Sequence, residues 1–208
     1  MYIEAAWLTL SMAFGGILFS LFLGLLCSLV LYFQVPMFNR IVSAYIELSR
    51  NTPLLVQLFF LYFGLPKIGI TINSQGCAVI GMAFLGGSYM AEAFRSGLES
   101  VEKSQIEAGS SIGLTQAQVI RYVVLPQALS VSVPPLCANI IFLIKETSVF
   151  SVVALADLMF VAKDLIGLYY KTDEALLLLV LSYLAILLPI SFGASLLERR
   201  LRYAGFGH

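Results

Sequence analysis

Charge is scarce in this 208-residue sequence: 12% of the residues are charged, 60% are hydrophobic, and twelve basic residues balance twelve acidic ones. A soluble domain carries about twice that charged fraction, which excludes an ordinary soluble protein. Because the net charge is zero, no overall positive field attracts nucleic acid. The composition predicts an integral membrane protein surrounded by lipid.

Metal-binding and catalytic patterns are missing as well. The one histidine, His208, ends the sequence, and we expect it to be a solvated tail. Cys27, Cys77 and Cys137 stand singly in or beside apolar stretches, whereas metal sites need paired Cys or His at short spacing. We therefore expect no metal site. An intramembrane enzyme is the weakest interpretation, since there is no histidine cluster, no G-x-S-x-G and no convincing carboxylate dyad.

Five apolar runs are candidate membrane spans, because a helix of roughly 20 residues crosses the bilayer core. The second is short: its charge-free part, residues 53–65, would rise only about 20 Å as a helix. We expect it either to extend upstream across Glu47 and Arg50 or to be a broken span buried by protein. The prediction is an all-α polytopic membrane protein, one domain of residues 1–208, with spans near 7–33, 50–65, 76–95, 127–145 and 175–197.

The distribution of Lys and Arg predicts the orientation of the chain. Residues 1–7 contain Glu4 and no basic residue, so we expect the first span to be retained rather than cleaved as a signal peptide. An outer N-terminus and an inner C-terminus give the better charge asymmetry. Eight basic residues would then lie inside and four outside: Arg40, Arg50, Arg95, Lys103, Arg121, Arg199, Arg200 and Arg202 against Lys67, Lys145, Lys163 and Lys171.

Two spans carry small residues at every fourth position. These are Gly16, Ser20, Gly24 and Ser28 in the first span and Ala83, Gly87 and Ala91 in the third. Such stripes let helix backbones approach closely in lipid, although small residues are common in all spans. We expect a helix contact there. Between the fourth and fifth spans, the mixed stretch 145–174 predicts a lateral helix at the outer surface.

A polar segment, residues 104–126, interrupts the apolar pattern and predicts two short capped helices. Ser104 with Glu107, and Thr115 with Gln118, have the spacing of capping boxes. Gly113 suits the end of the first helix, and Leu114 with Val119 has the spacing of a hydrophobic staple. The final residue of the segment, Pro126, marks the next helix boundary.

The same segment resembles the EAA loop, the cytoplasmic signature of permease subunits of bacterial ABC importers, whose consensus reads EAA, three residues, G, nine residues, I-x-L-P. The matching residues are Glu107, Ala108, Gly109, Gly113, Val123, Leu125 and Pro126, with Gly109 in place of alanine and Val123 in place of isoleucine. Segments 50–57, 88–95, 145–148 and 197–201 are similar to the polar amino acid branch, for example RNTPLLVQ beside its RGTPLLVQ.

The resemblance implies a type I-like importer fold in the bacterial cytoplasmic membrane and several partners. A second permease subunit, identical or different, would pair with this chain, and an extracytoplasmic binding protein would deliver an amino acid. The chain has no G-x-x-x-x-G-K-[ST] phosphate loop, so it would hold no cofactor, and ATP and Mg²⁺ would bind a cytoplasmic ABC ATPase dimer. Its implied docking residues here are Gln105, Glu107, Ala108, Gly109, Ser110, Gly113 and Leu114.

Several roles stay open. Glu107 could cap its helix or contact the ATPase. Asp157, Glu92 and Lys145 are candidate substrate groups, because charges at membrane depth usually face a cavity or a partner. The alternatives are an ion pair of Glu92 with Arg95, and pairing or snorkelling of Lys145 and Glu146. For the whole chain, the alternatives are another small polar cargo, or a channel or ion-gradient transporter without an ATPase.

Overall fold

A computed structural model describes residues 1–205, and the expected tail at His208 lies outside them. The described residues form helices without any β-strand, which confirms the all-α prediction. The α-helices are α1 (Tyr2–Tyr32), α2 (Phe38–Arg50), α3 (Leu54–Phe59), α4 (Ser74–Glu99), α5 (Lys103–Ser111), α6 (Gln116–Val119), α7 (Leu125–Glu146), α8 (Leu158–Tyr169) and α9 (Thr172–Gly205). Short π turns, η1 (Phe60–Gly64) and η3 (Ile120–Val124), and 3₁₀ turns, η2 (Leu65–Ile68) and η4 (Thr147–Val153), join some of them.

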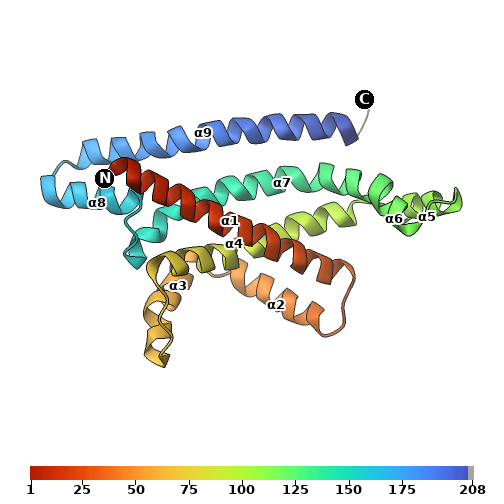
Figure 1. Cartoon of the computed structure of the whole chain (residues 1–208), viewed down its shortest axis with the longest axis horizontal. Helices are drawn as coiled ribbons and strands as arrows, with labels where there is room; N and C mark the ends of the chain where they lie inside the picture. The colour runs from red at the N-terminus through yellow and green to blue at the C-terminus, as the bar shows by residue number, and fades with distance from the viewer. Residues whose placement is uncertain (206–208) are drawn as a thin grey trace.

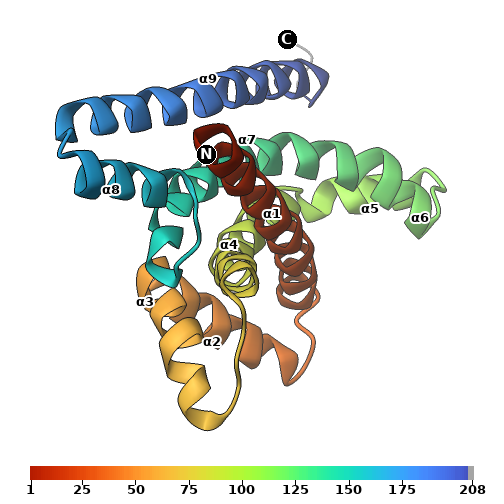
Figure 2. The ribbon, with the colours of Figure 1, turned by 60° about the vertical axis from the view of Figure 1, so that its left-hand side comes forward.

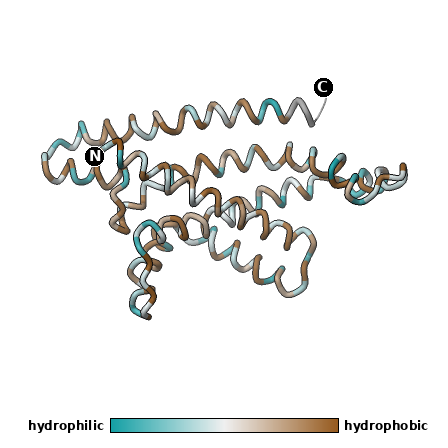
Figure 3. Tube along the Cα trace, viewed as in Figure 1, coloured by the Kyte–Doolittle hydropathy of each residue, from teal (hydrophilic) through white to brown (hydrophobic). Residues whose placement is uncertain are grey.

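Four helical runs are long and apolar enough to cross a membrane: Tyr2–Tyr32, Ser74–Glu99, Gln116–Val153 and Thr172–Leu201. They extend along the longest axis of the molecule, with α8 and the N-terminus at one end (Figure 1). The α1–α2 turn, α5, α6 and the last turns of α9 gather at the opposite end. Hydrophobic residues predominate along these long helices (Figure 3).

The second apolar run is broken. Helix α2 ends at Arg50, and a shorter apolar run, Leu54–Ile68, starts again after Pro53. The side chain of Gln57 bridges the break, because its Nε2 donates to Ser49 O at 3.2 Å and to Thr52 O at 2.9 Å. The break matches one of the two expected arrangements, but the expected burial by protein does not: Val56, Phe60 and Phe63 are 51%, 62% and 48% exposed.

Helix α4 is the centre of the fold and contacts α1, α2, α3 and α7 (Figure 2). Side chains from three neighbouring helices donate hydrogen bonds to its backbone carbonyls. The bonds are Ser20 Oγ to Met82 O at 3.1 Å, Tyr45 OH and Ser49 Oγ to Phe84 O at 2.7 and 2.8 Å, and Asn139 Nδ2 to Tyr89 O at 3.1 Å. These bonds fix α4 relative to the elements around it.

The predicted small-residue contact is confirmed between α1 and α4. A Cβ added at Gly24 would lie 2.8 Å from the backbone nitrogen of Ala91, and one added at Gly16 would lie 2.5 Å from Met82 Sδ. Gly87 contacts Leu23 of α1 and also Tyr45 of α2. The small residues therefore let the two backbones approach closely, as helices in lipid require.

The boundary predicted at Pro126 is a change of helix type rather than an end. Helical structure runs without interruption from Gln116 to Val153, and the π turn η3 directly precedes the first residues of α7. Proline has no N–H to donate, and a wider turn accommodates such local irregularity. The second short helix of the polar segment thus continues directly into the fourth apolar run.

Candidate functional site

The predicted capping box of Ser104 and Glu107 is wrong. Helix α5 begins two residues earlier than that box requires: its N-cap is Glu102, and Ser104 Oγ donates to Glu102 Oε2 at 3.0 Å. The reason is the burial of Val101, which packs in one apolar cluster with Ile106. These two residues stand at the positions of a hydrophobic staple. Packing of the staple therefore sets the helix start, and Glu107 caps nothing.

The other end of α5 forms as predicted. Gly113 has a left-handed backbone (φ 89°), its N–H donates to Ser110 O, and the N–H of Leu114 donates to Gly109 O. This pair of bonds is the Schellman arrangement that ends many helices. The second capping box is also confirmed: Thr115 N–H donates to Gln118 Oε1 at 2.8 Å, and Gln118 N–H donates to Thr115 Oγ1 at 3.4 Å.

A small apolar core joins α5 to the helix that follows. Val101, Val119, Val124 and Ala128 are buried together, and Leu114 packs against them, as the predicted staple requires. Gly109 is buried above this core, and a Cβ there would meet Val119 Cγ2 at 3.3 Å. The turn of residues 112–114 is thus held between two packed helices. We call residues 102–114 the docking segment.

The docking segment divides its predicted residues between two faces. Gln105, Glu107, Ala108, Ser110 and Gly113 are exposed, whereas Gly109 is buried and Leu114 is half-buried. The sequence interpretation missed Ile112, which is 79% exposed. Ile112 follows Ile106 by six residues, about 240° around the helix, so its spacing placed it away from the packed face. By the same reckoning Ile112 lies on the side of the helix that carries Gln105 and Ala108, and an exposed apolar side chain there suits a protein partner.

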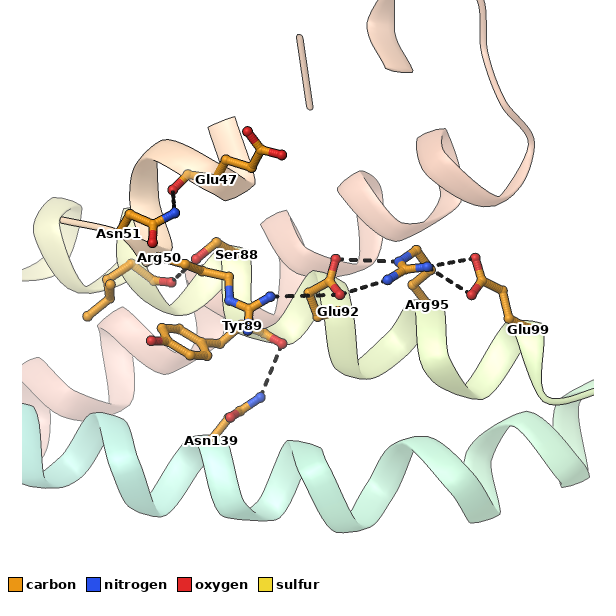
Figure 4. Close-up of polar contacts among 10 residues, drawn as sticks. Glu47, Arg50, Asn51, Ser88, Tyr89, Glu92, Arg95, Glu99 and Asn139 are labelled. Carbon is orange, nitrogen blue, oxygen red and sulfur yellow. Dashed lines mark hydrogen bonds and ion pairs between the residues drawn. The ribbon is translucent and has the colours of Figure 1, made fainter. Parts of the chain in front are cut away.

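Four charged residues, Arg50, Glu92, Arg95 and Glu99, contact one another in series and link α2 to α4, as Figure 4 shows. We call these four residues the charge chain. Glu92 Oε2 lies 2.8 Å from Arg95 Nη2 and 3.8 Å from Arg50 Nη1. Arg95 Nη1 also contacts both carboxylate oxygens of Glu99 at 2.8 and 2.9 Å. The guanidinium of Arg50 lies over the ring of Tyr89, 5.2 Å from its centre. The Glu92–Arg95 pair that we considered as an alternative is therefore present, and Glu92 is shared by two arginines.

Asp157 occupies the N-cap of α8 and is fully buried. Its Oδ1 accepts the N–H of Phe160 at 2.9 Å, while its Oδ2 has no hydrogen-bond partner. Burial raises the pKa of this carboxyl to about 6, against the opposing effect of the backbone N–H groups and of Lys163. The geometry gives Asp157 a capping bond, and its proposed contact with substrate stays a prediction.

The three candidate substrate groups do not meet. Lys145 is exposed near the end of α7, and Glu146 beside it is half-buried. No hydrogen bond or ion pair within residues 1–205 joins Glu92, Lys145 and Asp157 to one another. The same residues hold no cluster of three His, Cys, Asp or Glu side chains that could bind a metal ion. The docking segment and the charge chain are therefore the two places where the structure brings several of the predicted polar residues together.

Comparisons with known proteins cover nearly the whole chain. The family described as "Binding-protein-dependent transport system inner membrane component" matches residues 9–203. The sequence is 36% identical over 197 residues to a probable glutamine ABC transporter permease of Bacillus subtilis (strain 168), covering 92% of this chain and 89% of the relative. It is 35% identical over 202 residues to the glutamine transport system permease of Escherichia coli (strain K12), covering 96% and 92%.

Two solved structures of ABC transporters have chains with a similar fold. The crystal structure of an amino acid ABC transporter with histidines superposes with a TM-score of 0.88 at 33% identity, covering 96% of this chain and 93% of that one. An inward-facing methionine ABC transporter gives a TM-score of 0.75 at 23% identity, covering 97% and 96%. The second similarity concerns the fold alone.

Proposed function

The chain belongs to the family of binding-protein-dependent transport system inner membrane components, and from that premise we propose that it imports a polar amino acid at the expense of ATP bound to a partner. Its role as a multi-pass permease subunit of the inner membrane follows from the family. The cargo is inferred from the relatives, which are named for glutamine or amino acids. A different small polar solute is the alternative within the same family.

We propose that the docking segment binds a cytoplasmic ABC ATPase dimer, which holds ATP and Mg²⁺. The observation that carries this proposal is a helix fixed at both ends whose outer face stays free. The Schellman turn and the packed core hold α5, while Gln105, Glu107, Ala108, Ser110 and Ile112 are exposed. Gly109 and Leu114 pack against the apolar core beneath the segment, and Gly113 ends α5 with its left-handed backbone. A rigid protrusion of this kind suits the transfer of motion from a partner.

The same arrangement supports the proposed orientation. The docking segment, the α1–α2 turn and the last turns of α9 lie at one end of the molecule, and the N-terminus and α8 lie at the other (Figure 1). With the docking segment in the cytoplasm, the N-terminus is outside and can face the extracytoplasmic binding protein. A second permease subunit, identical or different, completes the transport path.

Reconstitution tests this function. The chain is copurified with its associated subunits, placed in vesicles, and supplied with binding protein and labelled amino acids. We expect an ATPase to copurify, and glutamine or another polar amino acid to stimulate both ATP hydrolysis and uptake. Uptake that follows an imposed ion gradient without ATP would instead establish the alternative, an ion-gradient transporter.

The variant Ile112→Asp tests the docking site in the same preparation. A charge at this exposed apolar position should release the ATPase, and Ala117→Asp, an exposed position in α6, is the matched control. Retention of the ATPase by Ile112→Asp would remove this face of α5 from the interface.

A further inference from the structure

We propose that Glu92 is a positioning residue that links the docking segment to the break between α2 and α3, rather than a group that binds the transported amino acid. The inference rests on the proposed function, because it concerns how the motion of a docked ATPase reaches the membrane helices. It starts from the position of Glu92 between two arginines, one on its own helix and one on α2.

One end of the charge chain lies at the break. Arg50 is the last residue of α2, and the chain resumes as a helix only at Leu54. Gln57, which is 8% exposed, ties the two sides of the break together through Ser49 O and Thr52 O. A movement of Arg50 would therefore be passed to the start of α3.

The other end of the charge chain lies at the base of the docking segment. Glu99 is the last residue of α4, and α5 starts at Lys103 after three intervening residues. Arg95 holds Glu99 through two contacts of 2.8 and 2.9 Å, and it holds Glu92 through one contact of 2.8 Å and one of 3.4 Å. Because Glu92, Arg95 and Glu99 share one face of α4 at spacings of three and four residues, the inner end of this helix moves as a unit.

The contact between Arg50 and Glu92 is the weakest member of the chain. Its 3.8 Å separation is a full ångström longer than the 2.8 Å contact between Glu92 and Arg95. Arg50 also has the ring of Tyr89 as a second partner, and a cation over an aromatic face is attracted to it. Arg50 can therefore leave Glu92 without losing every favourable contact.

Space for such a change is present beside the charge chain. A cleft of about 310 Å³ is lined by Gln34, Asn39, Ser43, Glu47, Glu92, Arg95 and Glu99, together with two apolar residues. Its polar wall solvates charged groups that would be costly to expose to lipid. Tyr45 and Ser49, the latter directly before Arg50, both donate to Phe84 O and hold the α2 backbone on α4. The movement at the Arg50–Glu92 contact is therefore a movement of the Arg50 side chain.

A double-mutant cycle on the reconstituted importer tests this role. Glu92→Gln, Arg50→Gln and the double variant are compared for ATP hydrolysed per amino acid imported. We expect each single variant to raise this ratio about fivefold or more, the lower limit of typical coupling between sites. The double variant should be no worse than either single one, because both remove the same contact. The concentration for half-maximal uptake should not change.

The control is Glu47→Gln, which neutralises another carboxylate of the same cleft that forms no ion pair among residues 1–201, whose side chains the structure describes. It should leave the ratio unchanged. If Glu92→Gln disturbs folding, Arg50→Gln still tests the contact, because Glu92 keeps its pair with Arg95.

Two results would overturn the inference: effects of the two single variants that add in the double variant, or an unchanged ratio of ATP hydrolysed to amino acid imported. In either case, ATP-driven uptake by the unmodified importer would still uphold the proposed function. A loss of amino acid affinity or selectivity in Glu92→Gln would assign Glu92 to the substrate instead. Absence of ATP-driven uptake in the unmodified importer would refute the proposed function and, with it, this inference.

Discussion

The N–H of Leu158, at the start of α8, donates to Thr9 Oγ1 of α1 at 3.2 Å, although 149 residues separate them in the sequence. Thr9 Oγ1 in turn donates to Ala5 O at 2.9 Å. The first N–H groups of a helix have no partner within it, and here Thr9 satisfies one while Asp157 satisfies another at Phe160. This junction fastens α8 to the N-terminal part of α1.

The cap at Asp157 predicts different effects for two substitutions. Asparagine caps a helix about as well as aspartate, whereas alanine loses about 0.5–2 kcal/mol. We therefore expect Asp157→Asn to be more stable than Asp157→Ala in thermal unfolding in detergent. Uptake by the Asp157→Asn variant tests the predicted contact with substrate separately: lost affinity or altered selectivity at normal stability would support the contact, and unchanged affinity and selectivity would leave Asp157 with the capping role alone.

The burial of Asp157 also predicts a pH dependence. Its pKa in the folded protein is about 6, above the ordinary value of 3.8, so the folded state binds this proton more tightly than the unfolded chain does. The contribution of Asp157 to stability must then increase as the pH falls from 7 to 4. Because other carboxylates titrate in the same range, the measurement is the difference in Tm between the unmodified chain and Asp157→Asn. We expect this difference to shift with pH in favour of the unmodified chain on acidification.

Most of the fold could be predicted from the sequence, because long apolar runs and small-residue stripes are patterns within single stretches of the chain. The stripe of Gly16 and Gly24 predicted a close contact, and the structure places it against α4. The break after Arg50 could not be assigned uniquely, since it depends on Gln57 reaching back to Ser49 and Thr52. A hydropathy pattern cannot predict these hydrogen bonds from the Gln57 side chain to backbone oxygens.

The docking segment shows where sequence patterns fail. Thr115 and Gln118 form the capping box that their spacing predicts, whereas Ser104 and Glu107, with the same spacing, do not. The difference is burial of Val101, which places the start of α5 two residues earlier than the box requires. Tertiary packing thus overrides a local pattern worth about 1 kcal/mol. The sharing of Glu92 between two arginines needed the position of α2, which spacing along α4 cannot supply.

The contact between α1 and α4 predicts that two glycines of one helix differ in their tolerance of alanine. A Cβ at Gly24 would lie 2.8 Å from the backbone nitrogen of Ala91, and backbone cannot move cheaply. We expect Gly24→Ala to destabilise the protein by about 1–3 kcal/mol, the usual cost of overpacking. In Gly15→Ala the new methyl group would meet Val79 Cγ2 at 3.7 Å, an ordinary contact.

Gly15→Ala should therefore be neutral or stabilising, by up to about 1 kcal/mol from helix propensity. Thermal unfolding in detergent compares the two variants directly. Equal losses of stability would show that α1 does not need close approach at Gly24.

The start of α5 makes a separate prediction for Glu107. Because its side chain is exposed and caps nothing, Glu107→Gln and Glu107→Ala should leave the helix equally intact. Ser104→Ala should be harmless as well, since the bond that the Ser104 side chain makes within the described part of the chain is to the exposed side chain of Glu102. In contrast, Gln118→Ala removes an observed cap and should loosen the helix that follows. Hydrogen exchange of the amides in α5 and α6 measures these effects.

Function then separates the two roles considered for Glu107. If its carboxylate contacts the ATPase, both substitutions should weaken assembly equally, by about tenfold for a contact worth ~1.4 kcal/mol, while hydrogen exchange in α5 stays unchanged. Ser104→Ala serves as the matched control from the same turn and should assemble normally. Normal assembly of Glu107→Gln alongside failure of Glu107→Ala would show that the charge is dispensable, and the contact would then depend on the size or amide bonding of the side chain. Normal assembly of both variants would leave the docking surface to Ala108, Ile112 and their exposed neighbours, so the comparison decides whether this glutamate acts on the partner at all.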